Sequence, residues 1–525
     1  MDALVLKSKI NSAMFIWLGL IACCLLYILN IREPSVDPFH TGEFFVAAVN
    51  LENGLSSITI HGMVNYLPAL ITHYFYGDDQ YIIPTVYVIK TLALFSSLIL
   101  ALTCYELLKK NSRKNEITAA IFIVSLGFIT HRDLFLALSL YTFLRILNSL
   151  KKEPKKSLEI TFGVVMAFTL FWAFDRGLSA VLAIGSAAVF YMISQKSMAF
   201  ISSIIAFAST LIILHYSFDI TSIDHYVGNI VSLVKSSSQW QYELSWRVAW
   251  FTLAATILLL IGWLNIFLAI RDSDNGESKA FLFALFLMSI IIFKSSINRA
   301  DLVHIVFSLI PLMYVFAYRL GANQSIILPT HFLGSTLSRA IFFSALIIFS
   351  IVFKAVTILM FGALLWLLLG QSERLNRFLL ISIISLSACL MLIKIIDSDK
   401  IKYLFNKNDK YSIASKGNVW VAKFLISHNT RCVLDMTNNG IINALTQLPS
   451  CTEFAYPVYA PTADDINLKE AFLNNQPNAV VYDSGFWSYK IDRKKMSDRY
   501  PILNKALLGK YKNKTCEFHY CILYN

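Results

Sequence analysis

Long apolar runs, separated by short polar connections, fill the chain up to about residue 395. A helix that spans a bilayer needs about 20 predominantly apolar residues, and most of these runs approach that length. The pattern therefore predicts an α-helical polytopic membrane protein with about 13 transmembrane helices. The predicted spans are residues 14–30, 81–108, 117–130, 134–147, 158–173, 178–193, 198–216, 248–270, 280–293, 302–317, 340–353, 355–369 and 378–395.

Beyond these spans the sequence becomes charged and mixed, and the division predicts a membrane domain over residues 1–400 and a small α/β domain over residues 401–525. Thr462 is placed to cap one helix of the second domain. The predicted strands are residues 432–436 and 479–483 with an antiparallel pair around 516–524, and the predicted helices are residues 441–448, 463–474 and 492–510.

Basic connections set the predicted orientation. Lysine and arginine gather at residues 109–114, 151–156 and 374–377, and all three connections face the cytoplasm if the N-terminus does. The first outer loop, residues 31–65, and the C-terminal domain then face outward. The net charge of +12 is mostly this topology signal, spread over short loops, so nucleic-acid binding is not expected.

Acidic and basic residues pair at the outer ends of the predicted helices. Ionisable groups near a bilayer are costly and are usually paired or functional. One interpretation is a local ion pair that caps each tight helical hairpin. Because three such pairs lie on one face, a shared site is also indicated. The residues are Arg132 and Asp133, Asp175 and Arg176, and Arg299 and Asp301.

The cysteines agree with this orientation. Of eight in the chain, Cys432, Cys451, Cys516 and Cys521 fall in the predicted outer domain. An even set outside the cytoplasm favours disulfides, most simply 432–451 and 516–521. Four free thiols would instead mean that the predicted topology is wrong.

The first outer loop carries the densest candidate chemistry. Asp37, His40 and Glu43 lie within DPFHTGE at residues 37–43, and His61 follows. A carboxylate here can serve as a general base, and a cluster of histidine and carboxylates can hold a divalent cation such as Mg²⁺ or Mn²⁺. The alternative is a capped turn that leads into an amphipathic helix with Glu43 in its first turn.

The motif DxxHxGE, followed by the HG pair at 61–62 and by Pro68, resembles the GT-C superfamily of membrane glycosyltransferases, in particular bacterial members that act on envelope polysaccharides. The segment RADxxH, with His304 at its end, resembles a late motif of such proteins. The resemblance implies an inverting transfer from a polyprenyl-phosphate-sugar donor to a glycan or lipid-linked acceptor at the outer face. It places the general base at Asp37, or alternatively at Glu43. The spacing differs from the compact Asp-Glu pair of protein O-mannosyltransferases.

A phosphate leaving group needs positive charge nearby, which Arg132, Arg176 and Arg299 can supply from the predicted outer face. The aspartates of the three pairs would orient those arginines, and His61 and His304 would bind sugar or phosphate. The resemblance favours a bacterial inner membrane with a periplasmic C-terminal domain, and otherwise the endoplasmic reticulum.

Two other classes remain open on the sequence. A transporter or flippase for a lipid-linked sugar would also need buried Arg–Asp pairs, although the sequence has no internal repeat. A polysaccharide polymerase would differ mainly in the size of its donor.

Overall fold

The computed structural model describes residues 20–25, 27–28, 39–55, 57, 59, 62–126, 129–150, 155–217, 223–236, 246–297, 307–324, 326, 411, 414–483 and 496–525. The last three predicted spans, 340–353, 355–369 and 378–395, lie outside these residues. So does most of the first span, 14–30.

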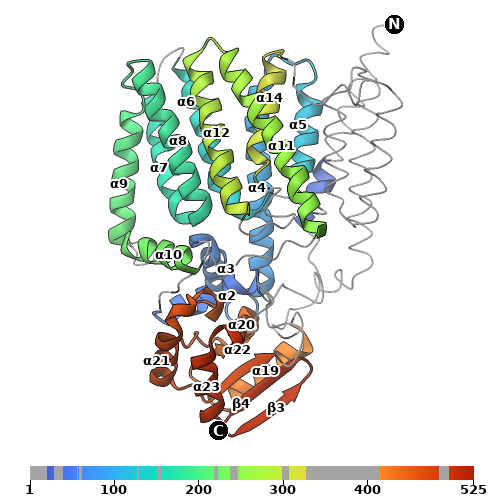
Figure 1. Ribbon diagram of the computed structural model, residues 1–525, viewed down its shortest axis with the longest axis vertical. Helices are drawn as coiled ribbons and strands as arrows, with labels where there is room; N and C mark the ends of the chain where they lie inside the picture. The colour runs from blue at the N-terminus through green and yellow to red at the C-terminus, as the bar shows by residue number, and fades with distance from the viewer. Residues whose placement is uncertain are drawn as a thin grey trace, which may run out of the picture.

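The long helices run side by side and form a bundle (Figure 1). Most of them match a predicted span to within a few residues. Helix α8 begins at Phe174 rather than at 178, so the predicted connection 174–177 forms its first turn. The bundle helices are α4 (Ile82–Leu107), α5 (Lys114–Ser125), α6 (Leu134–Ser149), α7 (Lys156–Trp172), α8 (Phe174–Ser194), α9 (Ile201–Ser217), α11 (Trp246–Arg271), α12 (Gly276–Ile297) and α14 (Ile310–Gly321).

Small residues allow the bundle helices to pack closely. Ala180, Ala183 and Ala187 recur on one side of α8 and are completely buried. Among the described helices, α4, α8 and α12 are long and apolar enough to cross a membrane. These features make the chain a helical membrane protein.

Three shorter helices lie between the bundle and the C-terminal part of the chain (Figure 1). They are α2 (Gly42–Glu52), α3 (Leu67–Tyr76) and α10 (Ile223–Ser236). Helix α2 is the one expected to follow the capped turn. It is not amphipathic, because residues 42–50 are all buried. Helix α10 occupies a connection in which no helix was predicted.

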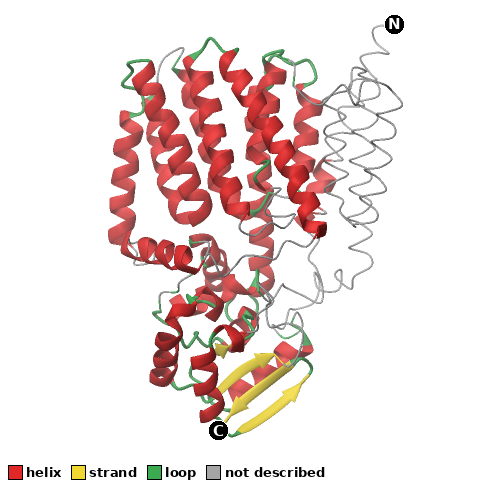
Figure 2. Cartoon of the chain, in the orientation of Figure 1, coloured by secondary structure: helices red, strands yellow, loops and turns green. Residues whose placement is uncertain are grey.

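The strands described all belong to one sheet near the C-terminus (Figure 2). Its order is β1-β2-β4-β3, with β1 parallel to β2 and the other neighbours antiparallel. The prediction for β2 is confirmed residue for residue. The strands are β1 (Leu434–Asp435), β2 (Ala479–Asp483), β3 (Asn513–Glu517) and β4 (Tyr520–Tyr524).

Helices cover both faces of this sheet. Val481 of β2 packs with Leu425 of α19 (Lys416–Ser427), whereas Val480 packs with Leu503 and Leu507 of α23 (Pro501–Lys510). Successive residues of a strand point to opposite faces, so Val480 and Val481 pack against the helices on opposite faces of the sheet. The remaining helices of this part are α20 (Gly440–Thr446), α21 (Asp465–Asn475) and α22 (Met496–Arg499).

Two local predictions in this part are wrong. The helix expected at 492–510 is divided into α22 and α23 at Pro501, which lacks the N–H needed inside a helix. Thr462 does not precede α21 directly. It begins a 3-10 turn, Thr462–Asp464, and α21 starts after that turn.

Candidate functional site

The described part of the predicted first outer loop, which includes residues 39–55, packs against one end of the bundle helices. The rings of Phe44, in α2, and His131 lie 5.1 Å apart. His131 begins the 3-10 turn η2 (His131–Asp133), and its carbonyl accepts a hydrogen bond of 3.0 Å from the indole of Trp172 at the end of α7. The start of α2 therefore lies next to η2 and the junction between α7 and α8.

Two of the predicted Arg–Asp pairs join in one network, and their short contacts cross between the hairpins. Arg176 Nε donates to Asp133 Oδ1 at 2.8 Å, and Arg132 Nη2 donates to Asp175 Oδ2 at 2.6 Å. Within the second pair, Arg176 Nη1 is 3.6 Å from Asp175 Oδ2. The local interpretation, in which each pair closes only on itself, is therefore wrong for these two pairs.

The Asp133–Arg176 pair is the buried half of the network. The two side chains are 2% and 5% exposed. Thr130 donates to Asp133 Oδ2 through its backbone N–H and its hydroxyl, at 2.9 and 2.8 Å, and this closes a capping box on η2. The Arg176 guanidinium also lies 4.9 Å from the centre of the Phe307 ring. With these contacts, Arg176 is a fixed positive charge in the wall of the site.

The Arg132–Asp175 pair is the accessible half, with side chains 17% and 33% exposed. Arg132 Nε is buried and has no hydrogen-bond partner in the described part of the chain. A buried N–H without a partner costs about 1–3 kcal/mol unless a ligand or water accepts from it. Arg132 is therefore a candidate for binding an anionic ligand, with its guanidinium held by Asp175.

Sequence reasoning missed Tyr226, which α10 brings to this site. Its ring packs edge-on against Phe171 and Phe174 at 5.5 and 5.1 Å, and its buried hydroxyl has no partner among the described residues. Burial, with a smaller contribution from Asp175, raises the pKa of Tyr226, which keeps the phenol protonated as a donor. Ile223, Val227 and Val231 recur at helical spacing and could have predicted α10.

His131 stays neutral at physiological pH. Burial, together with the charge of Arg132, lowers the pKa of His131 from 6.5 to about 3. The unprotonated ring adds no charge to the network, and the positive charge of the site comes from the two arginines.

In the first outer loop the structure separates the candidates. Glu43 is 2% exposed in the first turn of α2, where a helix N-terminus favours a carboxylate. His40 is exposed to solvent. Asp37 and His61 lie outside the described residues, as do Arg299, Asp301 and His304.

Phe39 and Gly42 of the same motif contact the C-terminal part of the chain. The Phe39 ring stacks on Tyr456 at 5.0 Å, and the Tyr456 hydroxyl donates to the Phe39 carbonyl at 2.9 Å. Gly42 lies directly against Gly440 at the start of α20, where a Cβ on Gly440 would be 2.1 Å from the Gly42 carbonyl oxygen. Two positions of the motif therefore serve packing rather than chemistry.

The structure contains two disulfides, Cys432–Cys451 and Cys516–Cys521, which are the pairs that the sequence favoured. The first joins the segment before β1 to the loop before the Pro457–Tyr459 turn. No group of three or more metal-binding side chains occurs within the described residues.

No protein-family model matches the sequence, and no curated protein matches it. Two crystal structures of ArnT from Cupriavidus metallidurans are similar in fold. The one bound to undecaprenyl phosphate has a TM-score of 0.52 at 11% identity, with 97% of each chain covered. The apo structure has a TM-score of 0.53 at 12% identity, with 98% of each chain covered. At these identities the likeness shows that the chain shares the fold of ArnT.

Proposed function

We propose that this chain is a membrane glycosyltransferase of the GT-C type that takes its sugar from a polyprenyl-phosphate-linked donor. The observation that carries the proposal is the crossed network of Arg132, Asp133, Asp175 and Arg176 beside the first outer-loop helix. ArnT, which shares the fold, was crystallised with undecaprenyl phosphate, a ligand of the same chemistry.

The arginines stabilise the leaving phosphate. Negative charge develops on the phosphate as its bond to the sugar breaks, and preorganised donors in a water-poor site stabilise such charge. Arg132 contributes its partly exposed guanidinium, Arg176 adds a fixed charge, and the Tyr226 hydroxyl donates a further hydrogen bond. Asp133 and Asp175 hold the guanidinium groups in place, so little reorganisation is needed during the reaction.

A carboxylate of the first outer loop removes the proton from the acceptor hydroxyl. Asp37 is the first candidate, because it directly follows the first predicted span. Glu43 is the second, because it is buried in the first turn of α2, next to Phe44, whose ring contacts His131 of η2. Attack from the face opposite the phosphate inverts the anomeric carbon.

The same mechanism assigns roles to further residues, an acceptor and a membrane location. His40 and His61, together with Arg299, Asp301 and His304, contribute to binding sugar or phosphate. The acceptor is an envelope glycan or a lipid-linked glycan at the outer face of a bacterial inner membrane, with the C-terminal part in the periplasm. A requirement for Mg²⁺ or Mn²⁺ is tested by adding a chelator to the assay.

The test is sugar transfer by the purified full chain in lipid nanodiscs, with a radiolabelled polyprenyl-phosphate sugar as donor. We expect loss of the base, by Asp37→Asn or Glu43→Gln, to lower kcat about 100-fold or more. Arg132→Gln should lower it by about 100- to 1,000-fold. Glu470→Gln, which neutralises an exposed carboxylate on α21, is the matched control and should leave kcat unchanged.

Each outcome decides a part of the proposal. Loss in only one of the two carboxylate variants, with normal folding, identifies the base. If the wild type transfers no sugar from any donor, or if both variants match it, the mechanism fails and transport of a lipid-linked sugar becomes the leading alternative.

A further inference from the structure

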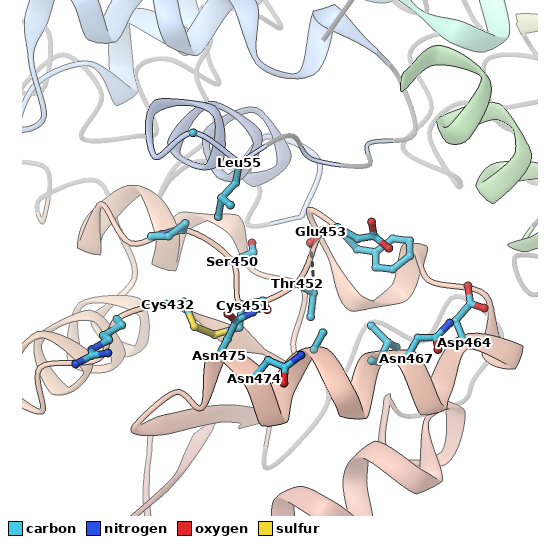
Figure 3. A pocket seen from close by; sticks show the side chains of 16 residues that line it. Leu55, Cys432, Ser450, Cys451, Thr452, Glu453, Asp464, Asn467, Asn474 and Asn475 are labelled. Carbon is cyan, nitrogen blue, oxygen red and sulfur yellow. Dashed lines mark hydrogen bonds between the residues drawn. A yellow bond between two sulfur atoms is a disulfide. The ribbon is translucent and has the colours of Figure 1, made fainter. Parts of the chain in front are cut away.

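A cleft of about 750 Å³ lies where the end of the first outer-loop helix meets the C-terminal part of the chain (Figure 3). Loop 449–454 forms one wall and helix α21 forms the other. Leu55, just past the end of α2, lies above the opening, Gly54 also lines the cleft, and the Cys432–Cys451 disulfide is part of the loop wall. None of the residues of the Arg–Asp network lines this cleft.

The walls are fixed to each other. Asn475 Nδ2, on α21, donates to the Cys451 carbonyl at 2.6 Å and so links the helix to the loop that carries the disulfide. Thr452 is buried and its hydroxyl donates to the Phe454 carbonyl at 3.3 Å. Because the hydrogen bond joins the two walls and the disulfide ties the loop to the segment before β1, the cleft is preformed, as ligand sites commonly are.

One face of α21 presents polar side chains to the cleft, and these side chains are available to bind a ligand. Asp464, Asn467 and Asn474 lie at spacings of three and seven residues, which places them on one side of the helix. Their side chains form no hydrogen bond within the described part of the chain. Ala471, a small residue, lies between them and leaves room for a ligand.

The charges of the lining exclude an anion and favour a neutral ligand. Arg431 is the one cation in the lining, and Glu453 and Asp464 add two carboxylates. A phosphate would meet more negative than positive charge here. Asparagine side chains offer donors and acceptors together, and carboxylates accept from hydroxyl groups. This combination suits a polyhydroxylated, uncharged ligand such as an oligosaccharide.

We infer that this cleft binds the glycan chain of the acceptor, at a distance from the reacting hydroxyl. The inference rests on the proposed function, because the glycan is an acceptor only if the protein transfers a sugar to it. Helix α2 begins at Gly42, beside the candidate base Glu43, and ends next to the cleft. Its 11 residues extend about 16 Å, at 1.5 Å per residue. Binding energy from this remote part of the substrate then positions the reacting end.

The experiment separates binding from transfer. The probe is a pool of hexa- to octasaccharides, released by mild acid from the envelope polysaccharide of the cell that makes the protein. Saturation-transfer NMR with the full chain in nanodiscs measures its affinity without any donor. We expect Asn467→Ala/Asn474→Ala to weaken binding about 5- to 100-fold, the loss of two hydrogen bonds. Ala471→Trp fills the cleft and should abolish binding.

The matched control is Lys469→Ala/Glu470→Ala, on the same helix but outside the lining, which should bind within twofold of the wild type. Inorganic phosphate should not displace the probe. The inference is overturned if the wild type does not bind, if both cleft variants bind as the wild type does, or if phosphate competes. Because this measurement needs no donor, a protein that binds the probe but transfers no sugar would defeat the proposed function and with it the role as acceptor site, and would leave only a glycan-binding cleft.

Discussion

Replacing Gly440 by alanine should loosen the contact between the first outer loop and the C-terminal part of the chain. The new Cβ would lie 2.1 Å from the Gly42 carbonyl oxygen and 2.7 Å from the Tyr456 hydroxyl, where an ordinary contact begins at 3.4 Å. The nearer atom belongs to the backbone, so no side-chain rotation relieves the clash. The start of α20 must therefore move about 1.3 Å away from α2, by the difference between those distances.

The free-energy cost has two sources. Overpacking a tight contact costs about 1–3 kcal/mol. The same displacement weakens the bond from Gly440 N–H to the Tyr456 hydroxyl, 3.2 Å, and the bond from that hydroxyl to the Phe39 carbonyl, 2.9 Å. Each such bond contributes about 0.5–1.5 kcal/mol. Since the two sources overlap, we expect a total loss of about 2–4 kcal/mol.

Thermal unfolding of the full chain in nanodiscs, followed by tryptophan fluorescence, measures the effect. The midpoint should fall by about 2–4 °C, because the unfolding entropy of 525 residues is about 1 kcal/mol per °C. Hydrogen exchange should accelerate in peptides from α2 and α20. Gly42→Ala should lower the midpoint less, because its Cβ would meet its nearest atoms at 2.9 Å. The control is Gly509→Ala in α23, where an added Cβ meets nothing within 4 Å and helix propensity favours alanine. Equal midpoints for Gly440→Ala, Gly509→Ala and the wild type would refute the reasoning.

Three further predictions concern the Arg–Asp network, His131 and the Cys432–Cys451 disulfide. Asp133→Asn should lower the free energy of unfolding by about 3–5 kcal/mol, because the buried Arg176 loses its partner. Arg132→Gln breaks the more exposed pair and should lower it by about 1 kcal/mol or less. Equal thermal midpoints for these two variants would contradict this expectation. The unfolded chain protonates His131 below pH 6.5 and the folded chain only near pH 3, so stability should fall with decreasing pH in this window, by up to about 1.4 kcal/mol per unit. His131→Gln should flatten that slope in thermal scans over the same pH range. Replacing Cys432 and Cys451 by serine opens a loop with a sequence separation of 19 and should cost about 3 kcal/mol, measured by urea unfolding under oxidising conditions.

The elements that the sequence predicted well are those whose hydrophobic pattern alone decides the structure. Helix α4 was expected at 81–108 and runs over Ile82–Leu107, because a bilayer imposes both length and composition. Strand β2 is apolar and bounded by polar residues, and its prediction is confirmed over 479–483. In both cases local sequence and burial point to the same element.

The sequence did not predict helix α10 or the pairing of Asp133 with Arg176. Both depend on tertiary contacts, and the apolar pattern of α10 is short. Helix α10 has an apolar face but lies in a polar connection, and its position is set by contacts such as that of Asn229 Oδ1 with the Thr59 N–H at 3.0 Å. The pairing of Asp133 with Arg176 joins residues 43 positions apart, and the sequence offered a nearer partner for each. Proximity in sequence therefore did not predict which of these charges pair.

The motif of the first outer loop contains residues that pack against the C-terminal part of the chain as well as a candidate catalytic carboxylate, and the sequence alone did not distinguish them. Its glycine and phenylalanine dock the C-terminal part of the chain, and its carboxylate lies in the first turn of the helix that they fix. Asn50, near the other end of α2, accepts a bond of 2.6 Å from the Ser450 N–H, beside the cleft. Tyr81, at the start of α4, accepts a bond of 3.3 Å from Gln447. Because α2 is held at both ends by the C-terminal part, a displacement of that part also moves Glu43. Under the proposed function with Glu43 as the base, binding of the acceptor chain and placement of the base would be coupled through one buried helix, so that weak docking should lower kcat as well as raise KM for long acceptors.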